Sequence, residues 1–280
     1  MSLARPAMPA AGAEACALPF PSHPGALTER ALPCPMKSPL IVVCTHHKTG
    51  SVWMANIFRA IKRAEKLQLH YKAQADLPPA TDIFLQDHSK VDLKALQARF
   101  PKRGVRAVHV IRDPRDVVIS GAFYHVKTVE KWANNPKKEY GGKSYRQAIS
   151  ALPTDHEKLV FEMDHTAGKT IREMQGWDYT QKDLCFEVRY EDLIVDRDLK
   201  VFKPMMAFLG YEGERLEMAL KHVAEQSLFG GAAGSDPADH IRSGEGRQWV
   251  KTFTPELKAA FKERFPEALQ LLGYETTSDW

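Results

Sequence analysis

Residues 40–65, LIVVCTHHKTGSVWMANIFRAIKRAE, decide the fold of this chain. The first six residues are a continuous run of apolar and β-branched side chains, which is typical of a strand buried on both faces. A short polar stretch, HHKTGS, follows at residues 46–51. From Val52 to Glu65 apolar residues recur every three or four positions, which predicts a helix with one apolar stripe. A buried strand, a tight polar turn and a helix make the opening unit of an α/β domain.

The same pattern returns further along the chain. Strands are predicted at residues 82–85, 105–111 and 184–190. Asp113 suits a helix N-cap and Pro114 the first helical turn, so a helix should begin there. Further helices are predicted at residues 155–175, 200–209, 213–224 and 254–273. This alternation predicts one α/β domain, in which a parallel sheet has helices on both faces.

Length and composition narrow the class of protein. The chain has 280 residues, of which 44% are hydrophobic and 26% charged, as in ordinary globular enzymes. Its four cysteines are scattered without CxxC spacing, which argues against a disulfide framework and a zinc site. The chain has no run of 18 apolar residues, so no membrane-spanning helix is predicted. The formal net charge of +4 suits an anionic ligand but is too small to indicate nucleic acid.

The N-terminal segment has a different composition from the rest. Residues 1–39 contain eight of the 18 prolines and nine alanines, and the prolines interrupt any stretch that could act as a secretory signal. We therefore expect a disordered Ala/Pro-rich leader at residues 1–38 and a folded domain at residues 39–280. Met36 is a candidate start of the natural chain.

Candidate site residues follow the predicted strands, since ligands bind at the carboxyl ends of parallel strands. In the turn after the first strand, Lys48 supplies a positive charge, and Thr49 and Ser51 supply hydroxyl groups. Gly50 allows close approach of the backbone, and the helix start that follows favours an anion. An ordinary polar turn is the alternative. The turn lacks the Walker pattern, in which glycine directly precedes lysine.

Two other segments carry similar chemistry. Residues 112–120, RDPRDVVIS, place Arg112 at a strand end, and Ser120 more than one turn into the next helix. Residues 242–249, RSGEGRQW, form a basic loop that contains glycine. Taken singly, the first could be a solvated helix start with paired charges and the second a flexible surface loop.

These three segments, in this order and spacing, resemble the sulfotransferases that use 3′-phosphoadenosine 5′-phosphosulfate (PAPS). The resemblance extends from about residue 40 to residue 249. Two weaker matches support it, namely YEDL at residues 190–193 after a strand and SLF at residues 227–229. The resemblance implies a P-loop-like three-layer α/β/α domain with a central parallel sheet.

The resemblance also implies a set of donor-binding residues. Those implied at the 5′-phosphosulfate are Lys48, Thr49, Gly50, Ser51 and Val52. Those implied at the 3′-phosphate are Arg112, Ser120, Arg242, Ser243 and Gly244. Those implied around the adenine are Trp53, Tyr190 and Phe229, for which core packing is the alternative. Guanidinium groups suit this role because they bind phosphate through two parallel hydrogen bonds.

A histidine is implied as the general base. In the family it follows the strand between the two phosphate motifs, and His88 holds the matching place in LQDH, residues 85–88. Gln86 stands where the family often has lysine, so one cation of the transition state is missing or supplied elsewhere. His46, His47 and Asp87 are competing candidates for the base.

The expected reaction is sulfuryl transfer from PAPS to a hydroxyl or amine of a small molecule or glycan, without a metal. Lys48 would stabilise the leaving phosphate. We expect a cytoplasmic monomer or homodimer that binds neither nucleic acid nor membrane. The alternatives are a P-loop kinase or nucleotide hydrolase using ATP and Mg²⁺, and a non-catalytic nucleotide-binding scaffold. Residues 127–144 are a candidate acceptor lid, and the aromatic side chains that could line its pocket are Phe123, Trp132, Tyr140 and Tyr145.

Overall fold

The computed structural model describes residues 38–71, 73–88, 90–227 and 246–280. Residues 1–37 of the expected leader lie outside this part, so the boundary between leader and domain stays a prediction. In the described residues, the strands are β1 (Leu40–Cys44), β2 (Leu69–His70), β3 (Ile83–Gln86), β4 (Val105–Ile111) and β5 (Cys185–Arg189).

The strands form one sheet in the order β2-β3-β1-β4-β5, and every neighbouring pair is parallel. The predicted fold class is therefore confirmed. β1 lies in the middle, where Val42 is in register with Phe84 of β3 and Ala107 of β4. All five residues of β1 are buried, as its apolar sequence requires. The strand β2 was not predicted, because two residues are too few to show a periodicity.

Helices fill the connections. The α-helices are α1 (Ser51–Glu65), α2 (Leu93–Arg99), α3 (Pro114–His125), α4 (Lys131–Asn134), α5 (Tyr145–Ser150), α6 (Asp155–Asp164), α7 (Thr166–Gln175), α8 (Tyr190–Leu193), α9 (Phe202–Phe208), α10 (Gly213–Gln226), α11 (Trp249–Thr252), α12 (Pro255–Arg264) and α13 (Ala268–Leu271). Two 3₁₀ turns are η1 (Gln74–Asp76) and η2 (Lys138–Tyr140).

Two helices predicted as continuous are divided in the structure. The helix expected at residues 155–175 breaks at His165, and α7 then packs closely on α6. The close approach needs Gly168, because a Cβ there would lie 2.0 Å from the carbonyl oxygen of Met163. The helix expected at residues 254–273 ends before Pro266, since proline disfavours helical geometry in the preceding residue.

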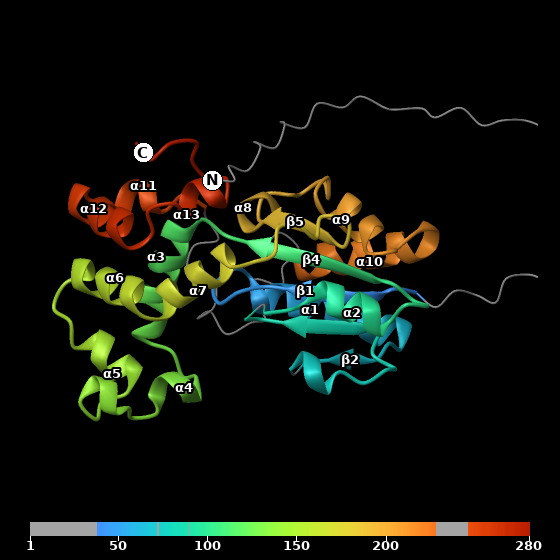
Figure 1. The fold of residues 1–280 in the computed structure, drawn as a ribbon, viewed down its shortest axis with the longest axis horizontal. Coiled ribbons are helices and arrows are strands. Elements are labelled where there is room, and N and C mark those ends of the chain that lie inside the picture. The colour runs from blue at the N-terminus through green and yellow to red at the C-terminus, as the bar shows by residue number, and fades with distance from the viewer. Residues whose placement is uncertain (1–37, 72, 89, 228–245) are drawn as a thin grey trace, which may run out of the picture.

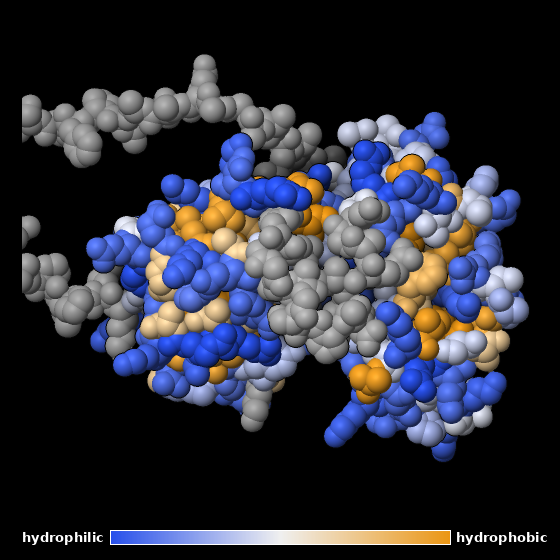
Figure 2. Space-filling model, turned by 180° about the vertical axis from the view of Figure 1, so that it is seen from behind, coloured by the Kyte–Doolittle hydropathy of each residue, from blue (hydrophilic) through white to orange (hydrophobic). Residues whose placement is uncertain are grey.

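Helices cover both faces of the sheet, and further helices lie beyond the carboxyl ends of its strands (Figure 1). One face packs against α1, α9 and α10, and the other packs against α2 and Trp177. A third apolar cluster joins α3, α6, α7, α12 and α13 beyond the carboxyl ends of the strands. Seen from behind, the surface is mixed in hydropathy, and a notch at its lower edge separates the sheet half from the helical half (Figure 2). No helix in the described residues is long and apolar enough to cross a membrane.

The strand order places a crevice between β1 and β4. The chain leaves β1 toward β2 and β3 on one side, and leaves β4 toward β5 on the other. Connections that part in opposite directions open a crevice at the carboxyl ends of the two strands, where α/β proteins bind ligands. The loops that meet there begin at residues 45 and 112.

Candidate active site

The polar turn after β1 is held in shape by its own side chains. The main-chain N–H of His46 donates to the hydroxyl oxygen of Thr49 at 2.8 Å. The hydroxyls of Thr49 and Ser51 donate to the carbonyl oxygen of His46 at 3.0 and 2.8 Å. Hydroxyl groups at these two positions therefore have a structural role in the turn as well as the donor-binding role that the sequence implies.

Two residues with left-handed backbones direct the chain from the turn into α1. Lys48 has a φ of 65° and Gly50 a φ of 97°. Gly50 also passes close to an aromatic ring, since a Cβ there would lie 3.1 Å from Tyr190. No side chain of the described residues caps the helix that begins at Ser51. Its first N–H groups and its dipole therefore favour an anion at this end.

The ammonium group of Lys48 lies in the crevice. Its Nζ atom is 3.6 Å from the centroid of the Tyr124 ring. Burial, followed by the nearby charge of Arg112, lowers the pKa of Lys48 to about 7. An anion bound near both groups would stabilise the ammonium form, and a lysine whose pKa is lowered in this way is a candidate functional residue.

Arg112 joins the two phosphate motifs. One of its Nη atoms donates to the carbonyl oxygen of Lys48 at 2.9 Å, and its guanidinium carbon lies 4.5 Å from the centroid of the Tyr190 ring. Its Nε–H is buried and has no hydrogen-bond partner among the described residues. Trp53 lies edge-on to Tyr190, with ring centroids 6.3 Å apart. The structure thus brings together Lys48, Gly50, Trp53, Arg112 and Tyr190 from three segments of the chain.

The other residues predicted to bind PAPS are more exposed or lie outside the described part of the chain. Val52 is 38% exposed at the start of α1, and Ser120 lies partly exposed on α3. No hydrogen bond or ion pair joins Ser120 to Arg112 in the described part of the chain. Phe229, Arg242, Ser243 and Gly244 lie outside the described residues, so their roles stay predictions.

The second arginine of the RDPR motif is structural. Arg115 is 2% exposed and donates to both carboxylate oxygens of Asp113, at 2.9 and 2.7 Å. It also pairs with Glu275 at 2.6 Å, and its guanidinium carbon lies 3.5 Å from the Trp249 ring centroid. Glu191 completes the support by accepting the N–H of Asp113 at 2.9 Å. Sequence reasoning missed this division of labour because both arginines have the same local signal.

His46 and His47 contact different histidines. The Nε2 atom of His46 lies 2.8 Å from Nε2 of His109 on β4. The Nε2 atom of His47 lies 3.0 Å from Nε2 of His125 at the end of α3. His46 has no exposed surface, whereas His88 is exposed. Burial makes His46 a less accessible candidate for the base than His88.

Each second histidine is paired with a carboxylate. The Nδ1 atom of His109 lies 3.1 Å from Glu187, and Nδ1 of His125 is bonded to Glu162. We call His46, His109 and Glu187 the His46 array, and His47, His125 and Glu162 the His47 array. Sequence analysis found neither array, because the paired residues lie more than 35 positions apart.

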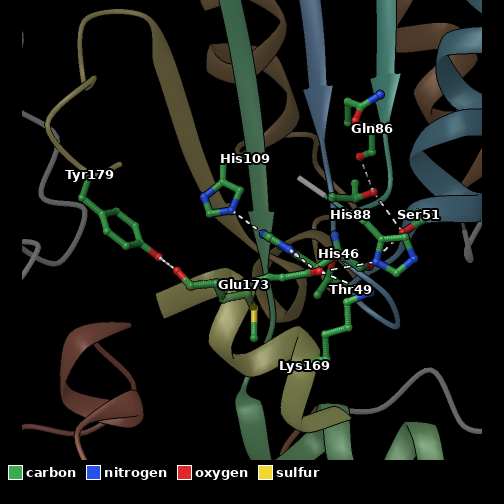
Figure 3. Close-up of polar contacts among 11 residues, drawn as sticks. His46, Thr49, Ser51, Gln86, His88, His109, Lys169, Glu173 and Tyr179 are labelled. Atoms are coloured by element: carbon green, nitrogen blue, oxygen red, sulfur yellow. Dashed lines mark hydrogen bonds and ion pairs between the residues drawn. The ribbon is translucent and has the colours of Figure 1, made fainter. Parts of the chain in front are cut away.

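His88 lies on the exposed rim beside both arrays. Its side chain is 48% exposed and its ring stacks on His47, with centroids 6.2 Å apart and planes 12° from parallel. Its Nδ1 atom lies 3.5 Å from a carboxylate oxygen of Glu173, which projects from α7 between His46 and His88 (Figure 3). Hydrogen bonding to Glu173 raises the pKa of His88. The exposed position keeps His88 as the candidate base.

Asp87 is engaged elsewhere. Its carboxylate accepts the phenolic hydroxyl of Tyr71, and burial together with this bond raises the pKa of Tyr71 above its usual range. Both residues line a cavity of about 100 Å³ next to the start of α1, which also includes Gln86. A carboxylate that already accepts a hydrogen bond from a phenol is a weaker competitor for the proton of the acceptor substrate.

The predicted acceptor lid contains local structure. Within residues 127–144, α4 and η2 form, and an isolated bridge pairs Pro136 with Ser144. Tyr145 is 1% exposed and packs with Tyr140 and Phe161 in a small core of the helical half. The expectation that Tyr140 and Tyr145 line an acceptor pocket is therefore not met, because their rings pack on each other.

Phe123 and Trp132 differ from that pair. Phe123 packs against the apolar cluster of α3, α6 and α7. Trp132 is partly exposed, and its ring lies 6.1 Å from that of His47. Of the four aromatic candidates, Trp132 is the one whose ring lies near both His47 and His125 and is also more than one-third exposed.

A larger groove includes Glu173 among its lining residues. It has a volume of about 840 Å³ and lies between the start of α2 and α7. Four cations line it (Lys90, Lys94, Lys169 and Arg172), together with the acids Asp92, Glu173 and Asp178. No group of three His, Cys, Asp or Glu side chains in the described residues is placed to hold a metal ion.

Comparison with known proteins agrees with this geometry. The sulfotransferase domain family matches residues 38–273. A crystal structure of mouse sulfotransferase SULT7A1 complexed with PAP is similar to this fold at 16% identity, with a TM-score of 0.54, covering 85% of this chain and 88% of the mouse chain. No curated protein matches the chain. The family match covers most of the chain, including the crevice with Lys48 and Arg112, and the chain therefore belongs to the family of PAPS-dependent sulfotransferases.

Proposed function

We propose that this enzyme transfers a sulfuryl group from PAPS to a hydroxyl or amine of a small molecule or glycan. The hydrogen bond from Arg112 to the carbonyl oxygen of Lys48 carries the proposal. This bond holds the Arg112 guanidinium against the turn that carries Lys48, so the two phosphate motifs lie side by side, which suits a donor that carries phosphate groups at two positions. The similar mouse protein is complexed with PAP, the nucleotide left after transfer, which supports the same donor here.

Each donor residue has a proposed part. The turn from Lys48 to Val52 binds the 5′-phosphosulfate through its side chains and the free N–H groups of α1. Arg112 and Ser120 bind the 3′-phosphate, and the late loop adds Arg242, Ser243 and Gly244. The adenine lies among Trp53, Tyr190 and Phe229. Only part of this set lies within the described residues, and the rest is carried over from the resemblance.

The chemistry is an in-line displacement at sulfur. A bond forms between the acceptor oxygen and sulfur while the bond from sulfur to the bridging oxygen breaks, so catalysis consists mainly of positioning and charge stabilisation. Lys48 neutralises the charge that develops on the leaving phosphate oxygens. His88 takes the proton of the acceptor hydroxyl. A cytoplasmic monomer or homodimer completes the proposal, on the strength of the resemblance alone.

Nucleotide binding tests the donor assignment. Calorimetry should show that adenosine 3′,5′-bisphosphate binds about 10- to 100-fold more tightly than AMP, because charge-assisted hydrogen bonds to the 3′-phosphate are lost with AMP. Arg112→Ala should remove most of this preference. Arg106→Ala, an exposed arginine on the same strand, is the matched control and should keep it. Equal affinity for the two nucleotides in the unaltered protein would contradict the assignment.

Turnover tests the reaction itself. A screen of acceptor classes with PAPS, read by an 80-Da mass increase on the acceptor, should find transfer without added Mg²⁺. Turnover that requires ATP and Mg²⁺ would instead favour a kinase or nucleotide hydrolase. Full nucleotide binding without transfer to any acceptor class would favour a scaffold.

A further inference from the structure

Glu173 lies between two imidazoles at the edge of the active site. Its side chain is 7% exposed, and the same carboxylate oxygen lies 3.5 Å from Nδ1 of His88 and 3.8 Å from Nδ1 of His46. Lys169, one turn earlier on α7, is 3.9 Å from the other oxygen and is mostly exposed. The hydrogen bond to the oxygen near the two imidazoles comes either from Nδ1–H of His46 or from Nδ1–H of His88.

The number of N–H protons in the His46 array decides which imidazole can donate. Three contacts link Glu173, His46, His109 and Glu187 in series, and each needs one proton. Two neutral imidazoles carry only two N–H protons between them. Glu187 lies 3.1 Å from Nδ1 of His109, so the proton of His109 is used there. His46 must then donate its Nε2–H to Nε2 of His109, at 2.8 Å. The Nδ1 atom of neutral His46 carries a lone pair and cannot donate to Glu173.

Two observations agree with a neutral His46. Its Nδ1 atom is buried and has no hydrogen-bond partner among the described residues. Burial, the largest influence, lowers the pKa of His46, which favours the neutral ring. The 3.8 Å gap to Glu173 is also too long for a hydrogen bond. His88 is therefore the imidazole that donates a hydrogen bond to Glu173.

We propose that Glu173 is the positioning carboxylate of His88: it accepts the Nδ1–H of that ring and turns the Nε2 lone pair toward the acceptor hydroxyl. The inference rests on the proposed function and deepens it. A carboxylate that fixes the tautomer of a histidine base is a recurring solution in hydrolases of unrelated folds. The separation of 3.5 Å is long for a hydrogen bond, and such contacts often tighten only when substrate binds.

The proton balance of the transfer follows from this arrangement. As the acceptor oxygen bonds to sulfur, its proton moves to Nε2 of His88, and the electron pair of the breaking bond stays on the leaving phosphate oxygen. The resulting imidazolium keeps its Nδ1–H on Glu173, and after product release it returns the Nε2 proton to water, since His88 is exposed.

The electrostatics of the pair support the arrangement. The charged and titratable groups that face His88 are Glu173, Asp87, Lys169, His46 and His47. Hydrogen bonding to Glu173 is the largest influence and raises the pKa of His88. Burial raises the pKa of Glu173, and the hydrogen bond and the charge of His88 act in the opposite direction and lower it. Contact with His88 therefore favours the ionised carboxylate.

Ring NMR of the histidines in the full chain tests the proposal without any acceptor. The His88 signals are assigned by their loss in His88→Gln. In the unaltered protein, ¹⁵N shifts should show the neutral ring protonated at Nδ1. Glu173→Gln should lower the pKa of His88 by about one unit, the usual effect of losing an adjacent opposite charge. Asp178→Asn is the matched control, because it removes a carboxylate of the same groove that does not contact His88, and it should leave that pKa unchanged.

A double-mutant cycle provides the kinetic readout. With any acceptor that the screen identifies, Glu173→Gln should lower turnover and shift the acid limb of the pH profile downward, with the donor KM unchanged. In a His88→Ala background the same substitution should change turnover no further, since Glu173 acts through His88. A structural role would instead lower turnover in both backgrounds.

The outcomes separate this inference from the proposed function. An unaltered protein with Nε2–H at His88, or a Glu173→Gln variant whose His88 pKa does not move, overturns the inference even if transfer from PAPS is confirmed. Full turnover in His88→Ala removes His88 as the base, whereas the NMR result would still report on the contact with Glu173.

Discussion

His46 and His47 are adjacent in sequence and serve opposite ends of the active site. Both donate to or accept from a second histidine, and both second histidines pair with a glutamate. The His46 array extends from the end of β1 through His109 of β4 to Glu187 of β5. Glu173 lies beside this array and contacts the exposed His88. The His47 array runs into the helical half and ends at the fully buried Glu162.

The two sides differ in what Glu162, the last residue of the His47 array, and Glu173, which lies beside the His46 array, contact. Glu162 also accepts the hydroxyl of Tyr145 at 2.9 Å and the N–H of Ala167 at 3.2 Å. Its bonds thus tie α3, α5, α6 and α7 together inside the protein. Glu173 instead faces an imidazole that reaches solvent. The same residue types are therefore fully buried at Glu162 and lie next to a solvent-exposed imidazole at Glu173.

Replacing His88 should give the largest effect and would break the functional side of the comparison. His88→Ala should lower turnover on an aliphatic alcohol by about 10²–10⁴-fold, because the general base is lost. The loss on an acidic phenol should be smaller, since that acceptor ionises unaided. Steady-state kinetics with both acceptors measures the asymmetry. His222→Ala, at a histidine paired on the surface of α10, should change neither rate. Full activity of His88→Ala on the alcohol would place the base elsewhere, with Asp87 and His47 tested next.

Replacing Lys48, which directly follows His46 and His47 in the sequence, should have the second largest effect. Lys48→Ala should lower turnover at saturating donor by roughly 10²–10³-fold, because a preorganised cation at the leaving group is removed. Arg63→Ala, at an exposed cation on α1, is the matched control. If Lys48→Ala raised only the donor KM, the ammonium group would bind donor without stabilising the transition state.

Replacing Glu162 tests the structural side. Glu162→Ala should destabilise the fold by about 3 kcal/mol, because His125 and Tyr145 lose a buried charged partner. For a domain of this size that corresponds to a fall in Tm of roughly 6–12 °C. Glu225→Ala, which breaks an exposed pair on α10, should change the free energy of unfolding by less than about 0.5 kcal/mol. Equal melting of the two variants would show that the His47 array does not hold the helical half together.

The pH dependence of donor use should show the smallest effect. Since the pKa of Lys48 is about 7 in the free enzyme, the ammonium form is lost as the pH rises through 7. We expect kcat/KM for the donor to fall about tenfold per pH unit above this value. At saturating donor the fall should begin at higher pH, because bound phosphates stabilise the ammonium form. A flat profile between pH 7 and 9 would contradict the lowered pKa.

The sequence predicted the parts of the site that depend on neighbouring residues. A buried strand followed by a polar turn and a helix placed Lys48 and Gly50, and the Asp-Pro pair placed Arg112 at the end of β4. The resemblance to sulfotransferases then grouped Trp53 and Tyr190 with them as donor-binding residues, and in the structure the Tyr190 ring lies against both Trp53 and Arg112. The β2 strand and the breaks in two helices escaped prediction, since short elements and close packing leave little periodicity.

The sequence could not predict which members of a pair carry function. Arg112 and Arg115 look alike in RDPR, yet Arg115 is held by Asp113, Glu275 and Trp249 from the C-terminal region. Glu173 had no signal at all, because a single glutamate on an amphipathic helix is usually a solvated residue. Its position beside His88 depends on α7 lying next to the loop that follows β3, where residues 85 positions apart meet.

By itself, the sequence determined the parallel α/β architecture and the polar turn between β1 and α1. These depend on local properties, namely β-branched runs that extend the backbone, glycine that accepts a positive φ, and Asp-Pro that starts a helix. Tertiary structure alone decided that His46 is buried, that His47 supports the helical half, and that Glu173 faces His88. Those outcomes depend on the strand order and on how α3 and α7 pack against the ends of β1 and β4, since burial and proton sharing are set by neighbours distant in sequence.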